Sequence, residues 1–192
     1  MTTKEIISGE YRNKTSREVM QARLEREPFD RTTISFYRYI NMLQLNIKNE
    51  TSKLRAVVLG IANSNGGIPK VEDCYDPKSV EHVKAGTYPK EEDMIPEMEA
   101  VAAVLKKYNV EVFRPKVIKN YNQIFSRDIA FVIDDKFIEA NILPDREREY
   151  KAIDKVISQI NPENIVVLPE ECHVEGGDVM PWNEYIFVGT YS

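Results

Sequence analysis

Two acidic motifs are the part of this chain best suited to chemistry. One is Phe125-Ser126-Arg127-Asp128, which precedes an apolar run, and the other is Val174-Glu175-Gly176-Gly177-Asp178. A guanidinium group is a planar cation that stays protonated at any working pH. Carboxylates beside it accept paired, charge-assisted hydrogen bonds that both hold and orient it. Asp128 and Glu175 therefore predict a site that binds a guanidinium group.

Each motif also has a simpler interpretation. Arg127 and Asp128 at the start of a strand are typical of a surface ion pair, which contributes about 0–1 kcal/mol, and on spacing alone this interpretation is favoured. Two glycines permit a tight turn and a close backbone approach, but a Gly-Gly turn with solvated acids is common before a strand. The two motifs together, within one α/β pattern, favour a site.

The composition is ordinary for a soluble globular protein, with 42% hydrophobic and 30% charged residues in a chain of 192. A formal charge of −5 argues against binding to nucleic acid or to an anionic membrane. Cys74 and Cys172 are too few and too far apart for a disulfide framework or a zinc site. The sequence contains neither a stretch of the roughly 20 apolar residues that cross a bilayer nor a signal peptide. We therefore expect a cytoplasmic protein.

Residues 1–50 predict an N-terminal extension, separate from an α/β domain over residues 51–192. Thr15 and Glu18 fit a capping box, and a short helix would follow it as far as about Glu27. Residues 32–40 are rich in β-branched and aromatic side chains, which indicates a strand. Residues 41–52 are polar without a clear period and predict a linker.

The rest of the chain repeats a strand–loop–helix–strand order, which indicates an α/β fold. Pro96 fits a helix only in its first turn. The expected elements are a strand at 54–61, a long loop at 62–90, a helix at 92–108, strands at 110–113, 129–133 and 136–143, a helix at 147–160, and strands at 164–168 and 185–189.

From about Leu54 onward the chain resembles the guanidino-group-modifying (pentein) superfamily, which includes glycine amidinotransferase, arginine deiminase and dimethylarginine dimethylaminohydrolase. The long loop and the Ile-Glu-Ala strand favour the amidinotransferases among these. The shared motifs are Phe125-Ser126-Arg127-Asp128, Phe137-Ile138-Glu139-Ala140-Asn141, Arg146-Glu147-Arg148-Glu149-Tyr150 and Val174-Glu175-Gly176-Gly177-Asp178, and the strand at 55–60 is similar to that family's opening strand.

The resemblance implies a fold and a mechanism. The fold would be a partial α/β-propeller, with about two of five repeated units, that carries the N-terminal helix–strand extension. Asp128 would bind the guanidinium of an arginine-like substrate, and Glu175 would be the acid of a Cys-His-acid arrangement. Arg146 would bind a substrate carboxylate or pair with neighbouring acids, and Asp178 would support or join the clamp.

In that family a thiolate attacks the central guanidinium carbon, an amine or ammonia leaves, and the covalent amidino intermediate passes to water or to an amine. No metal or organic cofactor is implied. The family's catalytic His and Cys normally lie well downstream of the Gly-Gly-Asp turn, and His82, His173, Cys74 and Cys172 match neither motif. We therefore expect this chain on its own to be inactive and to self-associate through exposed sheet edges.

Two other functions remain open at this stage. The chain is alternatively a non-catalytic guanidinium-binding or interaction module, in which the clamp survives without the chemistry. Residues 11–42 also resemble the opening segment of rhodanese-type tRNA uridine hydroxylases, which implies a fusion fragment related to tRNA modification. The acidic balance of the chain and its lack of a basic stripe weigh against RNA binding.

Overall fold

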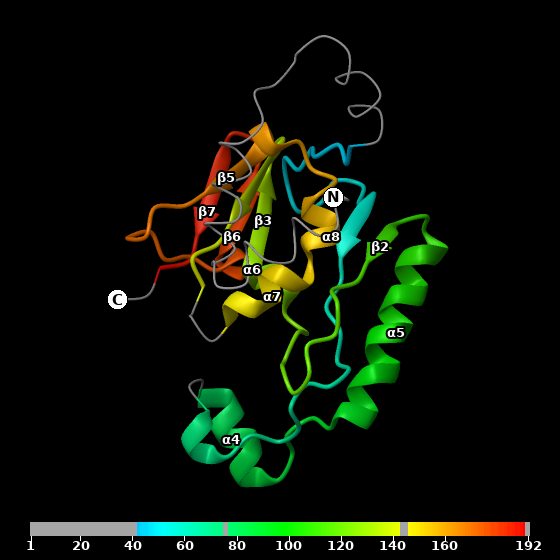
Figure 1. Cartoon of the computed structure of the whole chain (residues 1–192), viewed down its shortest axis with the longest axis vertical. Helices are drawn as coiled ribbons and strands as arrows, with labels where there is room; N and C mark the ends of the chain where they lie inside the picture. The colour runs from blue at the N-terminus through cyan, green and yellow to red at the C-terminus, as the bar shows by residue number, and fades with distance from the viewer. Residues whose placement is uncertain (1–41, 75–76, 143–145, 191–192) are drawn as a thin grey trace, which may run out of the picture.

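Three small sheets, with helices between them, form the part of the chain that the structure describes. This computed structural model describes residues 42–74, 77–142 and 146–190. One sheet pairs β1 (Ala56–Val58) with β2 (Glu111–Phe113), a second has the order β3–β4–β5, and a third pairs β6 with β7. Figure 1 shows β2 and α5 on one side of the molecule, the other two sheets on the opposite side, and α4 at the lower end.

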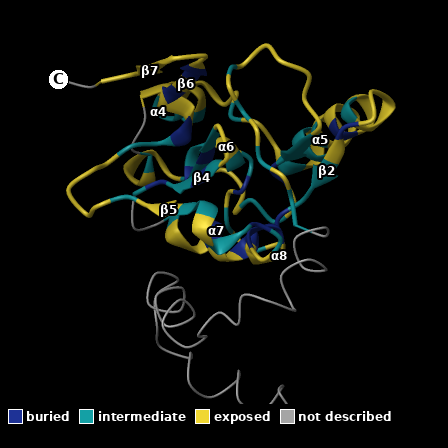
Figure 2. Ribbon diagram, turned by 90° about the horizontal axis from the view of Figure 1, so that it is seen from above, coloured by how far each residue is buried: buried dark blue, intermediate teal, exposed yellow. Residues whose placement is uncertain are grey.

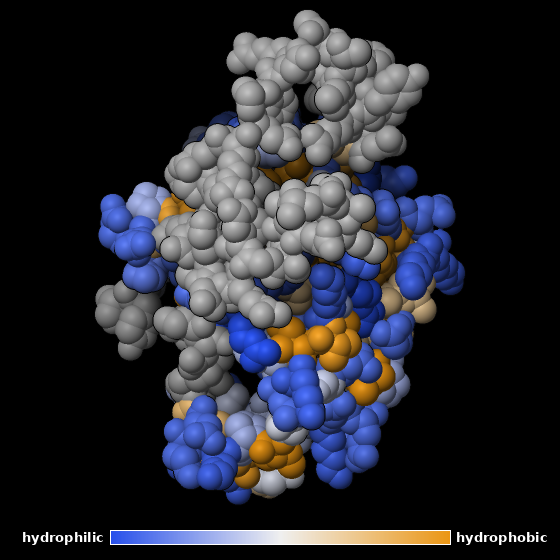
Figure 3. All heavy atoms as spheres, in the orientation of Figure 1, coloured by the Kyte–Doolittle hydropathy of each residue, from blue (hydrophilic) through white to orange (hydrophobic). Residues whose placement is uncertain are grey.

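The first unit is a parallel strand pair with a long crossover. β1 and β2 are parallel in the register Val57↔Val112, and the crossover contains η1 (Val71–Asp73), α4 (Pro77–Ala85) and α5 (Glu91–Lys107). Acidic residues in the first turn of α5 and lysines in its last turn complement the helix dipole. Hydrophobic residues form small separate groups among hydrophilic ones over the half of the surface that carries α4 and α5 (Figure 3).

The structure corrects two sequence predictions in this unit. Residues 62–90 were expected to be a loop, but they contain α4, which begins at Pro77. Proline suits the first position of a helix because the amide at that position has no partner inside the helix. Pro96 lies inside α5 rather than in its first turn, because the helix begins at Glu91.

The second unit contains a mixed three-stranded sheet. β3 (Ala130–Ile133) and β4 (Lys136–Glu139) are antiparallel, and β5 (Ile165–Val167) is parallel to β4. The crossover from β4 to β5 contains α7 (Glu147–Ala152), α8 (Asp154–Ile157) and η3 (Pro162–Asn164). One continuous helix at 147–160 was expected, but the structure divides it at Ile153, where the backbone leaves helical geometry.

The sheet of the second unit is covered on both faces. Phe137 packs on its α7–α8 face with Tyr150 and Ile157, whereas Phe131 packs on the other face with Val179. Side chains of successive strand residues point to opposite faces, so neighbouring strand residues enter different clusters. In Figure 2, α7 and α8 lie on one side of β4 and β5, while β6 (Val179–Trp182) and β7 (Tyr185–Val188) lie on the other.

The segment before β1 is part of this body rather than a linker. Ile47 forms a bridge with Asp134, and Asn49 forms one with Trp182. Leu43 and Leu45 pack against the cluster beneath α7 and α8. The polar residues between them point outward, so the segment alternates like an edge strand and its expected linker role is wrong.

The helix expected after Thr15, the strand expected at 32–40 and all but the last residue of the segment 11–42 lie outside the described residues. Within the described residues the α/β pattern is confirmed. Closure of repeated units into a propeller stays a prediction. Among the described helices, none combines the length and the apolar character needed to span a membrane.

Candidate functional site

The guanidinium of Arg146 lies at the centre of an acidic cluster. Arg146 immediately precedes α7 and takes the N-cap position of that helix. Its Nη1 lies 3.0 Å from Asp128 Oδ2 and 3.5 Å from Glu175 Oε1. Its Nη2 donates to the carbonyl oxygen of Phe125 at 3.2 Å. Asp128 and Glu175 therefore converge on one flat cation, as their motifs predicted, and that cation is a side chain of the protein itself.

Glu149 is the residue of this cluster that sequence reasoning missed. Its carboxylate accepts from Arg146 Nε at 2.7 Å and from Nη2 at 3.3 Å. This fork is the strong bidentate form of the arginine–carboxylate interaction. Glu149 is only 3% exposed, whereas an acid on a short helix is usually solvated. The signal available in the sequence was the spacing of three residues between Arg146 and Glu149, which places both on one helix face.

Asp128 is positioned by a single helical turn, α6 (Ser126–Ile129), that leads into β3. The hydroxyl of Ser126 donates to the carbonyl oxygen of Val58 at 2.8 Å, which ties the turn to β1. Asp128 was expected at the start of a strand, and the structure places it one turn earlier. The turn aims its carboxylate toward the α7 end of the second unit.

Glu175 is positioned by the Gly-Gly turn, which forms a 3-10 turn, η4 (Gly176–Asp178). A Cβ atom on Gly176 would lie 2.1 Å from the carbonyl oxygen of Arg127, and one on Gly177 would lie 2.8 Å from Asp128 Oδ1. Only glycine allows the backbone to approach that closely. The two glycines therefore bring the two acidic motifs into contact.

Arg127 holds the turn rather than pairing with Asp128. Its Nε donates to the carbonyl oxygen of Gly176 at 2.8 Å, and its Nη2 donates to that of Val179 at 2.7 Å. Its acidic partner is Glu50, at 2.8 Å. The simpler interpretation, a surface ion pair between Arg127 and Asp128, is therefore wrong.

Carboxylates outnumber cations in this cluster, and the pKa values reflect that imbalance. Burial raises the pKa of Glu149 above its ordinary value of 4.5, although Arg146 opposes the shift. Burial and the Asp128 carboxylate raise the pKa of Glu175. Burial tends to lower the pKa of Arg146, but the hydrogen bonds and charges of Glu149 and Asp128 outweigh it and raise that pKa. One guanidinium thus offsets only part of the negative charge.

Two carboxylate oxygens of the cluster remain available to a ligand. Asp128 Oδ1 and Glu175 Oε2 have no hydrogen-bond partner among the described residues. The Asp128 side chain is 21% exposed and that of Glu175 is 39% exposed, so both side chains are partly exposed to solvent. The cluster can therefore accept a second donor-rich cation beside Arg146.

Asp178 lies near the cluster without contacting Arg146. Its negative charge contributes to the raised pKa of Glu175, and its carbonyl oxygen accepts from the Gly189 amide at 2.8 Å. Its expected place in the clamp stays a prediction.

The histidines and cysteines of the described residues do not contact the cluster. His82 pairs with Thr87 at 2.9 Å, and Cys74 donates to the carbonyl oxygen of Lys70 at 3.3 Å. His173 and Cys172 are exposed side chains ahead of Glu175. Within the described ranges no group of three or more metal-ligating side chains is present.

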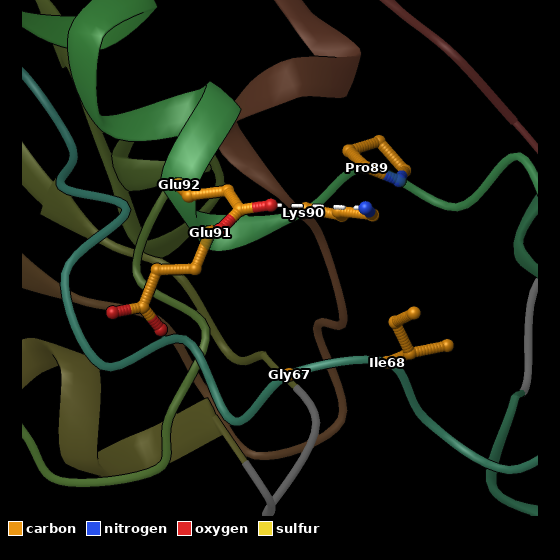
Figure 4. A pocket seen from close by; sticks show the side chains of 6 residues that line it. All are labelled: Gly67, Ile68, Pro89, Lys90, Glu91 and Glu92. Atoms are coloured by element: carbon orange, nitrogen blue, oxygen red, sulfur yellow. Dashed lines mark ion pairs between the residues drawn. The ribbon is translucent and has the colours of Figure 1, made fainter.

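Two cavities lie elsewhere in the described chain. One, of about 220 Å³, is lined by residues 67–68 and 89–92 (Figure 4). There Lys90 faces Glu92 while the Glu91 side chain points away, and its carboxylate accepts from the amides of Ser64 and Asn65. The other, of about 530 Å³, lies between residues 43–58 and the α8 side of the second unit. Neither of these two cavities is lined by a residue of the acidic cluster.

Solved structures show which known fold this arrangement shares. SxtG, an amidinotransferase from Microseira wollei in the saxitoxin biosynthetic pathway, superposes with a TM-score of 0.55 at 17% identity, over 75% of this chain and 54% of that one. The inosamine-phosphate amidinotransferase StrB1 from Streptomyces griseus gives 0.50 at 15% identity, over 73% and 53%. The fold is amidinotransferase-like.

The chain spans about half the length of each of these two structures. No protein-family model and no curated protein sequence matches it. At this level of identity the superpositions establish the fold alone, so the chemistry of the site has to be argued from its own residues.

Proposed function

We propose that this chain carries the guanidinium-binding part of an amidinotransferase-like or deiminase-like active site that acts on an arginine-type substrate. One observation carries the proposal: Asp128 and Glu175, from motifs far apart in the sequence, both reach the guanidinium of Arg146. The amidinotransferase-like fold supports it.

Charge balance explains why the cluster would take a second guanidinium. Asp128, Glu149 and Glu175 surround the single cation Arg146. When all are ionised, two negative charges remain, and part of this charge lies on buried or half-buried groups where electrostatic interactions are stronger than in water. A planar ligand cation that donates to Asp128 Oδ1 and Glu175 Oε2 would neutralise them.

In the proposed mechanism Asp128 binds and orients the substrate guanidinium, while Glu175 holds a histidine that acts as general acid and base. Arg146 fixes both carboxylates, and Asp178 adds negative charge beside Glu175. A cysteine thiolate would form a C–S bond to the guanidinium carbon, and the departing amine would take a proton from the histidine. Water or an amine then attacks the carbon and releases the thiolate. The thiolate and the histidine would be supplied by polypeptide additional to this chain.

The direct test is the binding of arginine by calorimetry. We expect the chain to bind arginine weakly, with Asp128→Asn lowering the affinity at least about tenfold, the loss expected for one charge-assisted hydrogen bond of about 1.5–3 kcal/mol. Asp135→Asn is the matched control, because Asp135 lies in the exposed β3–β4 turn and, among the described residues, forms its ion pair with the neighbouring Lys136 at 3.2 Å. Arginine binding that is absent at millimolar ligand, or equal in the two variants, would contradict the proposal.

The affinity for arginine is also expected to fall as the pH is lowered. Because burial and Asp128 raise the pKa of Glu175 above 4.5, this group takes up a proton at a higher pH than a free glutamate does. The protonated group no longer attracts a cation. Titrations from about pH 8 down to about pH 4.5 should show the loss beginning above 4.5, and Glu175→Gln should remove that part of it. An unchanged pH profile in Glu175→Gln would exclude this role.

A second candidate function is a guanidinium-binding module without catalysis. The observation that favours it is that no histidine or cysteine side chain of the described residues contacts the acidic cluster. Incubation with arginine, scored for citrulline, ornithine and ammonia, distinguishes the two. Arginine binding without any product, also when a polypeptide completing the fold is added, would favour the module.

A further inference from the structure

The cavity of about 530 Å³ between residues 43–58 and the second unit has an apolar floor. Core side chains form part of this floor, namely Phe137, Val156 and Ile160 at 5%, 4% and 2% exposure. Half-buried apolar residues of the segment before β1 and of β1 itself also line it: Leu43, Leu45, Ile47, Val57 and Val58. Small-molecule sites typically enclose about 300–1,000 Å³ with a mostly apolar lining. The cavity is therefore large enough for a small ligand with an apolar chain.

The charged residues that line this cavity are all cations. They are Lys48, Lys53 and Arg55, and no acidic residue of the described chain lines it. The whole sequence has 31 acidic and 26 basic residues, so the lining runs against the overall balance. None of the three cations forms an ion pair with another described residue. Glu50, which lies between Lys48 and Lys53 in the sequence, pairs with Arg127 at 2.8 Å.

Backbone hydrogen bonds hold the cations beside the cavity. The carbonyl oxygen of Lys48 accepts from the Asn183 amide at 2.7 Å, and that of Arg55 accepts from the Glu111 amide at 2.9 Å. Lys48, Lys53 and Arg55 are all exposed. Long cationic side chains cover apolar surface with their stems while the charged end stays in water. Their positive ends therefore lie at the mouth of the cavity, above its apolar floor.

We propose that this cavity binds an amphipathic carboxylate, an aliphatic chain that ends in one carboxylate group. The chain would lie against the apolar floor, and the carboxylate would accept charge-assisted hydrogen bonds from Lys48, Lys53 and Arg55. A neutral apolar ligand would leave these cations unpaired, whereas a small anion without a chain would leave the floor empty. The charge of the lining and its apolar floor together define the class of ligand. This inference is independent of the proposed arginine binding.

The test titrates the full chain with octanoate, butanoate and 1-octanol by calorimetry. Because each buried methylene adds about fourfold in affinity, octanoate should bind at least about tenfold more tightly than the shorter butanoate. Octanoate should also bind more tightly than 1-octanol, which has the same chain length and no charge. Equal affinities for octanoate and butanoate, or for octanoate and 1-octanol, would overturn the proposal.

A double variant, Lys53→Gln with Arg55→Gln, tests the cations. One exposed ion pair contributes up to about fivefold in affinity, so this variant should bind octanoate about tenfold more weakly and 1-octanol equally well. Lys106→Gln with Lys107→Gln is the matched control, because both lysines are exposed in the last turn of α5 and line neither cavity. Circular dichroism verifies that each variant is folded. An equal loss in the two double variants would mean that octanoate responds only to overall charge, against the proposal.

Methyl signals in NMR spectra locate the ligand without any variant. Octanoate should shift the signals of Val58, Val132 and Val156, which line the cavity. The signals of Val101 and Val104, which are exposed on α5, should not change. Binding that leaves the three cavity valines unshifted, or no binding at millimolar octanoate, would overturn the proposal.

Discussion

Arg146→Met is expected to lower the free energy of unfolding by about 3 kcal/mol, because removing one partner of a buried ion pair leaves the other charge uncompensated. Glu149 is 3% exposed, and its carboxylate accepts hydrogen bonds from two guanidinium nitrogens of Arg146, at 2.7 Å and 3.3 Å. Methionine keeps much of the length and packing of arginine, so the loss reports the charge. Urea denaturation at neutral pH measures it.

The loss should depend on pH in a defined direction. Without Arg146, burial raises the pKa of Glu149 further above 4.5. The folded variant then binds a proton that the unfolded chain releases, so its stability falls as the pH rises from about 4.5 through the raised pKa. Lowering the pH into that window should recover part of the loss relative to wild type.

Two further variants make the Arg146 result specific. Arg146→Met with Glu149→Leu removes both charges, and it should recover a large part of the stability because no buried charge is left without a partner. Arg114→Met removes an arginine from a more exposed pair with Glu99, 2.8 Å apart, and should cost less than about 1 kcal/mol. Equal losses in Arg146→Met and Arg114→Met would show that the cluster does not depend on its central cation.

The regular elements of the fold were predictable where local pattern and packing agree. The apolar run around β1 and the amphipathic α5 were expected at nearly their observed positions. β6 was missed because Pro181 interrupts its short apolar run, and proline in such a run argues against a strand. α4 was missed because the glycines and asparagines at 63–67 and the prolines at 69, 77 and 89 led the whole of residues 62–90 to be interpreted as one loop, although only Pro77 falls within the nine-residue helix.

The site was predictable in its charges but not in its partners. Asp128 and Glu175 lie in acidic motifs that are visible in the sequence, and in the structure both side chains reach Arg146. The roles of Glu149 and Arg127 depend on contacts that no local pattern contains. Burial of Glu149 results from packing of the second unit, and Arg127 binds Glu50 across 77 positions of the chain. Tertiary contacts, rather than spacing, decide which acid is solvated and which is buried.

Gly176→Ala is expected to destabilise the chain by about 3 kcal/mol or more, at the upper end of the cost of overpacking. The new Cβ would lie 2.1 Å from the carbonyl oxygen of Arg127 and 3.0 Å from that of Ala130. Both are backbone atoms, so neither can rotate away as a side chain does. Relief requires η4 to move away from α6, which would also break the hydrogen bond of 2.8 Å between Arg127 Nε and the Gly176 carbonyl oxygen.

Gly177→Ala is the matched control one residue away. Its Cβ would lie 2.8 Å from Asp128 Oδ1, which is the end of a side chain that can turn aside, so the loss of stability should stay within about 1 kcal/mol. Because Asp128 must move, arginine binding should weaken although the fold is kept. Urea denaturation and calorimetry on both variants separate the two effects, since Gly176 supports the contact between the two motifs and Gly177 supports the position of the carboxylate. A Gly176→Ala chain as stable as Gly177→Ala would mean that the two motifs do not meet as described.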